Sequence, residues 1–206
     1  MKNKKWSKTG KIEKDQTKLY LKAFDLIHEA LHACIVRDLV KEFRYERAER
    51  LRTYNVIATF SHVALENYAI QQLWKLFDKN NSVFNVWHVV ENMPHPGLKE
   101  WFKVEINKIK GSLRNLEVWR QNFVGHRSEE GHLVPNEIEQ KFPNRNQHEI
   151  ILKDFLIDLL CQMKFEMQGK PTENTKKNLL EGLQGYKRFV IDDKGKIFKS
   201  YNLIKK

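Results

Sequence analysis

Apolar residues recur at steps of three and four along most of the chain, which is the spacing of one face of an α-helix. This spacing predicts a long helix over residues 15–43 and a second over residues 46–78. In the second helix the steps of four and three alternate, as expected of a helix packed against neighbours along its length. A third long pattern covers residues 98–124. Together these segments predict an all-α fold, an up-and-down helical bundle.

Polar and helix-breaking residues separate the long segments. The run Lys-Asn-Asn-Ser at residues 79–82 is a plausible end for the second helix, because Asn and Ser favour caps and turns. The stretch 93–97 contains two prolines and a glycine, so it breaks the chain before the third long pattern. Shorter helices are expected over residues 83–91, 136–143, 149–167 and 170–185.

The two ends of the chain differ from the middle. Residues 1–14 contain six lysines and a glycine with little to bury, so they predict a flexible basic arm before a helical domain over residues 15–185. The tail, residues 186–206, alternates weakly around Asp-Lys-Gly at 193–195, which leaves a small C-terminal β-hairpin open.

Composition places the chain among globular proteins and narrows its partners. The 206 residues are 41% hydrophobic and 31% charged, and no apolar run approaches the roughly 20 residues that cross a bilayer. No apolar segment follows the basic N-terminus, so we expect no secretory signal, and Cys34 and Cys161 lie in helical patterns typical of reduced core cysteines. These features favour a cytoplasmic protein without a membrane span.

The chain is strongly basic. Its net charge is +11, from 37 Lys and Arg against 26 Asp and Glu. Such an excess favours polyanionic partners, which are nucleic acid or an anionic membrane surface. The alternative is a soluble basic protein without a polyanionic partner.

One arginine interrupts the apolar stripe of the predicted 98–124 helix. Arg120 takes the next place on that stripe, where a guanidinium is costly unless it is paired or lies in a wet cleft. His126 follows six residues later, and Asn122 lies four before His126 on its face. Gly125 is a good place to loosen the last turn, and either a distorted turn or the long arginine side chain could bring the two groups to one pocket.

The stretch 120–126, Arg-Gln-Asn-Phe-Val-Gly-His, resembles the Arg-x(4–6)-His motif of the HEPN superfamily. Arg127 and the upstream run Leu-Trp-Lys-Leu-Phe-Asp at 73–78 look like the abortive-infection AbiU-type branch of that superfamily. The resemblance covers residues 15–130. The chain departs from the common residue types of the branch at Gln121, Gly125 and Ser128.

The resemblance implies a metal-independent endoribonuclease without a cofactor. In such enzymes the 2′-hydroxyl attacks the adjacent phosphate and leaves a cyclic phosphate and a 5′-hydroxyl. The residue types suit this chemistry, because His126 can exchange a proton at physiological pH and Arg120 can hold the phosphate. Asn122 would orient the histidine or the scissile group. These three residues are the predicted catalytic set.

RNA contacts and partners complete the prediction. Arg127, Gln121, Lys110 and Arg114 are the candidate substrate-binding residues, although Lys110 and Arg114 also fit a solvated face. The resemblance implies a homodimer whose motifs face one another, acting in abortive infection or as the toxin of a toxin–antitoxin pair with a cognate antitoxin protein. The alternative is a non-catalytic HEPN-like module that binds RNA, a nucleotide or a protein.

Two structural alternatives stay open. Arg120 could pair with a core carboxylate such as Glu66 or Asp78, and His126 could interact with the helix dipole. In the first helix, His28-Glu29-Ala30-Leu31-His32 matches the HExxH pattern of zinc proteases. No predicted strand precedes it, and no third ligand is obvious, although Glu42, Glu46 and Glu49 could be proposed. A zinc hydrolase is therefore the less favoured alternative, and no metal site is expected.

Overall fold

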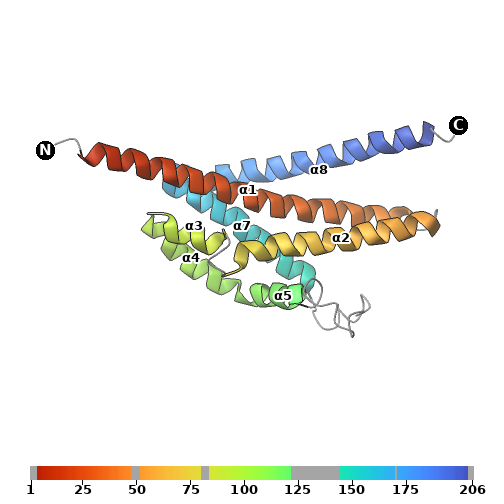
Figure 1. Cartoon of the computed structure of the whole chain (residues 1–206), viewed down its shortest axis with the longest axis horizontal. Helices are drawn as coiled ribbons and strands as arrows, with labels where there is room; N and C mark the ends of the chain where they lie inside the picture. Colours follow the sequence, from red (N-terminus) through yellow and green to blue (C-terminus); the bar gives the residue numbers. More distant parts are fainter. Residues whose placement is uncertain (1–3, 48–51, 80–83, 122–143, 170, 204–206) are drawn as a thin grey trace.

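The computed structural model describes residues 4–47, 52–79, 84–121, 144–169 and 171–203. Within these ranges the chain forms helices and no strand, which confirms the predicted all-α fold. The helices are α1 (Lys4–Arg47), α2 (Arg52–Phe77), α3 (Val86–Asn92), α4 (Pro96–Lys108), α5 (Lys110–Arg120), α7 (Arg145–Gln168) and α8 (Thr172–Leu203) (Figure 1).

The helices pack as a bundle around α1 and α7. Helix α1 lies along α2 for much of its length and also contacts α7 and α8. Helices α3, α4 and α5 cover the side of the bundle away from α8. Helix α7 runs obliquely between α8 and the pair α4 and α5 (Figure 1). The two faces of the bundle are therefore built by different helices: α5 with α7 on one, and α1 with α2 and α8 on the other.

Helix α7 explains why one core serves the whole bundle. Between Phe155 and Met163 all but two of its residues are buried, so it is apolar on several sides rather than along a single stripe. Such a helix must be surrounded, and it contacts α1, α4, α5 and α8. Cys34 and Cys161 are buried and unpaired, as expected of reduced core residues. Burial raises the pKa of their thiols to about 12 and about 11, which makes them inert.

The predicted long helix over 98–124 is divided. Its first part is α4, which starts at Pro96 with proline in the first turn, and Ile109 (φ −96°, ψ 7°) separates α4 from α5. The buried positions of α5 are Ser112, Leu116 and Trp119. The break shifts which residues face the core, and this shift decides where Arg120 lies.

The expectations for the two chain ends have different outcomes. Residues 4–14 belong to the first turns of α1, and the expectation of a flexible basic arm stays a prediction. The hairpin around residues 193–195 is wrong, since α8 continues without interruption to Leu203. Glycine costs about 1 kcal/mol in a helix interior, which a helix of this length absorbs. The boundary expected at residue 185 falls inside α8.

Among the described residues, none of the helices carries a stretch long and apolar enough to cross a bilayer.

Candidate functional site

The predicted catalytic motif starts at the C-terminal end of α5. Arg120 is the last residue of that helix and is exposed, and its guanidinium carbon lies 5.0 Å from the centre of the Trp74 ring on α2. The prediction that Arg120 lies on the buried stripe is wrong. Trp119 takes that place, with 4% of its surface exposed, because the break at Ile109 changes the phase of the buried face.

The structure places only part of the predicted site. Gln121 follows Arg120 and is exposed, and Lys110 and Arg114 are exposed on α5. Their spacing puts Lys110, Arg114 and Gln121 on one face of the helix. The remaining predicted residues lie outside the described part of the chain: Asn122, His126 and Arg127.

Of the two carboxylates proposed as core partners of Arg120, that of Glu66 is engaged elsewhere. Glu66 pairs with Arg145 and lies 3.4 Å from Arg37. The backbone of Asp78 closes the end of α2, where its carbonyl accepts a hydrogen bond from Asn85 at 2.6 Å. Within the described ranges, the contact recorded for the Arg120 guanidinium is the ring of Trp74.

A buried ion-pair network lies between α1, α2 and α7. Arg37, 5% exposed, donates to both carboxylate oxygens of Glu149 at 2.7 Å, which is the paired geometry that suits a guanidinium. Asp38 also accepts from Arg37 at 2.7 Å, and Lys153 lies 3.0 Å from Glu149. We call Arg37, Glu66, Arg145 and Glu149 the buried charge cluster.

Interactions within the buried charge cluster keep its residues ionised at neutral pH. Burial alone would raise the pKa of Glu149, but the hydrogen bonds and charge of Arg37 outweigh it and lower that pKa to about 2. The same contacts raise the pKa of Arg37 despite its burial. Burial, followed by the charge of Arg37, lowers the pKa of Arg145 to about 9, so Arg145 still carries its charge at neutral pH.

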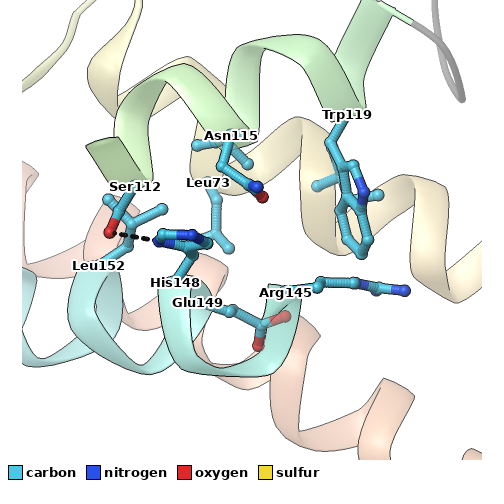
Figure 2. A pocket seen from close by; sticks show the side chains of 10 residues that line it. Leu73, Ser112, Asn115, Trp119, Arg145, His148, Glu149 and Leu152 are labelled. Atoms are coloured by element: carbon cyan, nitrogen blue, oxygen red, sulfur yellow. Dashed lines mark hydrogen bonds between the residues drawn. The ribbon is translucent and has the colours of Figure 1, made fainter. Parts of the chain in front are cut away.

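The buried charge cluster reaches α5 through Arg145. Its guanidinium carbon lies 3.1 Å from the centre of the Trp119 ring, and Figure 2 shows the two side chains facing one another from α7 and α5. Beside them, Ser112 and Nδ1 of His148 are 3.0 Å apart and join the same two helices. The pocket between these residues has room for little more than a water molecule. The cluster therefore holds the end of α5 in place and leaves no space for a substrate.

Sequence reasoning missed this cluster for a physical reason. Arg37 and Glu149 are 112 positions apart, so neither points to the other along the chain. One signal was present, because Arg37 follows the buried Cys34 by three residues and so continues an apolar stripe with a charge. Arg120 also continues an apolar stripe of the sequence, but it is exposed. A charge on an apolar stripe therefore does not by itself distinguish a buried arginine from an exposed one.

The HExxH pattern lies on α1, remote in sequence from the predicted motif. Glu29 accepts a hydrogen bond from the hydroxyl of Tyr68 at 2.7 Å, and the rings of His28 and His32 meet edge to face with centres 5.1 Å apart. His32 stacks on Tyr186 of α8 at 3.8 Å. The described residues contain no group of three or more His, Cys, Asp or Glu that could hold a metal ion. The zinc-hydrolase alternative thus lacks a third ligand there.

Comparisons of the chain with models of known protein families, with curated proteins and with solved structures find no match. The resemblance to the HEPN superfamily rests on the residues at 120–128 and 73–78 alone.

Proposed function

We propose that the chain is a metal-independent endoribonuclease of the HEPN type. The observation that carries the proposal is the place of Arg120, the first residue of the Arg-Gln-Asn-Phe-Val-Gly-His stretch. It stands exposed at the end of α5 with its guanidinium against Trp74. An arginine in that position can contact a phosphate of RNA that binds to the surface of the protein.

The contact with Trp74 suits a phosphate-binding arginine. A ring face attracts the guanidinium and restrains the long side chain, but it does not neutralise the charge as a carboxylate would. The planar group therefore keeps N–H donors for two phosphate oxygens. Lys110 and Arg114 are exposed on the same helix, and a net charge of +11 attracts RNA over a longer range.

The proposed reaction needs no metal or cofactor. The 2′-hydroxyl of RNA loses its proton and attacks the adjacent phosphorus, and the P–O5′ bond breaks. The products are a 2′,3′-cyclic phosphate and a 5′-hydroxyl that gains a proton. His126 exchanges the proton, Arg120 stabilises the charge that builds up on the phosphate, and Asn122 orients the histidine or the scissile group. Arg127 and Gln121 add contacts to the RNA.

The resemblance also supports a proposed assembly and biological role for the enzyme. Two copies of the chain would face one another at their motifs, and RNA would bind across the two-fold axis. The enzyme would act in the cytoplasm as an effector of abortive infection, or as a toxin that a cognate antitoxin protein restrains.

The test is an RNA cleavage assay in EDTA. Full-length protein is incubated with total RNA and with transfer RNA, and the ends of the products are identified. Wild type should cleave and leave 2′,3′-cyclic phosphate ends, while His126→Ala should lose at least about a hundredfold in rate. Arg188→Ala is the matched control, because it removes an exposed arginine from α8 and should cleave as wild type does.

Two results would overturn the nuclease proposal. One is RNA that stays intact with wild-type protein in EDTA, and binding without cleavage would then favour the non-catalytic alternative. The other is cleavage by His126→Ala at the wild-type rate, which would place the active residues elsewhere.

A further inference from the structure

A groove on the face of the bundle built by α1, α2 and α8 has no role in the proposed nuclease. Residues of all three helices line it. Its lining includes aromatic and imidazole rings of α1, the rings of Tyr68 on α2 and Tyr186 on α8, and the carboxylates of Asp25 and Glu29. We call it the α1–α8 groove.

The rings of the α1–α8 groove form a continuous series. Phe24 stacks on His28 with ring centres 4.1 Å apart, and His28 meets His32 edge to face. His32 in turn stacks on Tyr186 at 3.8 Å, so the series crosses from α1 to α8. Tyr68 stands beside this series and is 42% exposed. The faces of the phenylalanine and tyrosine rings carry negative potential and attract cations.

The charges of the groove are unusual for this chain. The described residues that line it include Asp25 and Glu29 but no lysine or arginine, although the chain has 37 of these cations. The hydroxyl of Tyr68 binds Glu29 at 2.7 Å and fixes the direction of its carboxylate. An anionic ligand would therefore meet carboxylates and ring faces, and a cation would meet complementary groups.

The imidazoles do not cancel these negative charges at neutral pH. Burial lowers the pKa of His28, the neighbouring His32 lowers it further, and Asp25 opposes the shift. Burial also lowers the pKa of His32. Nε2 of His28 is buried without a hydrogen-bond partner in the described part of the chain, a situation that disfavours a protonated ring. The lowered pKa of each ring favours its neutral form, so the imidazoles leave the charges of Asp25 and Glu29 in place.

We propose that the α1–α8 groove binds an organic cation, an ammonium or guanidinium group, between its ring faces and the carboxylates of Asp25 and Glu29. A metal ion fits less well, because the described residues offer no set of three ligands. The cation comes either as a free small molecule or as the side chain of a peptide. Bound there, it contacts three helices at once and ties α8 to α1 and α2. The inference does not depend on the proposed nuclease.

The experiment measures binding of two guanidinium probes to the full-length protein by isothermal titration calorimetry. Agmatine represents a free cation and N-acetylarginine amide represents an arginine side chain. We expect wild type to bind at least one of them, and the tighter probe identifies the source. Glu29→Gln keeps the shape of the side chain and its bond to Tyr68 but should weaken binding by about tenfold.

Matched variants separate the groove from the overall charge. Glu100→Gln removes an exposed carboxylate from α4 and should change affinity by less than about twofold. Tyr186→Leu removes a ring face and should also weaken binding, with helical content checked by circular dichroism. The proposal is overturned if wild type binds neither probe, or if Glu29→Gln binds as tightly as Glu100→Gln.

Discussion

Two arginines near the end of α5 lie close to tryptophan rings, and their surroundings are opposite. Arg145 lies 3.1 Å from the ring centre of Trp119, and a carboxylate, Glu66, pairs with it. Arg120 lies 5.0 Å from the ring centre of Trp74 and is exposed at the helix end. The same combination of arginine and tryptophan therefore stabilises the fold in one place and presents a charge to solvent in the other.

The difference shows what decides the use of an arginine. A guanidinium that is already paired with carboxylates has little attraction left for a phosphate, and removing its partner leaves a buried charge that costs about 3–5 kcal/mol. An exposed guanidinium restrained by a ring costs the fold little and keeps its charge for a ligand. We therefore expect substitutions in the buried charge cluster to change stability, and substitutions of Arg120 to change activity.

The largest effect should follow from breaking the buried charge cluster. Glu149→Gln removes the carboxylate that Arg37 holds with two hydrogen bonds of 2.7 Å, and it leaves a buried guanidinium without that partner. The free energy of unfolding should fall by about 3–5 kcal/mol, measured by urea denaturation. Asp154→Asn, at an exposed position of the same helix, should lower the free energy of unfolding by less than about 0.5 kcal/mol. Equal losses in the two variants would contradict the role given to the cluster.

Acid should weaken the same contact without mutation. The pKa of Glu149 is about 2 in the folded protein against an ordinary 4.5, so its ionised form stabilises the fold above pH 4.5. That contribution, on the order of 3 kcal/mol, should be lost as the pH falls from 4.5 toward 2. Unfolding free energies measured across this range test it. A double variant, Arg37→Met with Glu149→Leu, should lose less stability over the same range, and an identical slope would count against the assignment.

Matched substitutions at the two arginines compare the regions directly. Lysine keeps the charge but loses the planar fork, so Arg145→Lys should lower the free energy of unfolding by about 1–3 kcal/mol. Arg120→Lys should change it by less than about 0.5 kcal/mol, because the side chain is exposed. Thermal unfolding followed by circular dichroism measures both. A larger loss for Arg120→Lys than for Arg145→Lys would reverse the comparison.

The smallest expected effect concerns the imidazoles of the α1–α8 groove. The pKa of His28 and of His32 is lowered in the folded protein, so the unfolded chain takes up protons first as the pH falls below 6.5. Stability should therefore decline slightly from pH 7 to pH 5.5. His32→Phe keeps a ring against Tyr186 and should flatten this decline, as read from melting temperatures at each pH. A decline unchanged in this variant would remove His32 from the explanation.

The sequence predicted the long helices because their apolar spacing extends over many turns. It did not predict the break at Ile109, since an apolar residue on the buried stripe carries no sign of a helix end. That one break moved Trp119 into the core and Arg120 out of it. The ion pair of Arg37 and Glu149 depends on tertiary packing, which local patterns do not encode. The C-terminal hairpin, left open by the sequence, is wrong because the weak alternation around residues 193–195 lies within the continuous helix α8.

The most direct test of the nuclease proposal is the rate of RNA cleavage in EDTA by Arg120→Ala, measured beside wild type and Arg188→Ala. We predict that Arg120→Ala loses at least about a hundredfold in rate while its melting temperature matches that of wild type. Arg188→Ala should keep the wild-type rate. Cleavage by Arg120→Ala at the wild-type rate would show that the exposed arginine at the end of α5 does not contact the reacting phosphate.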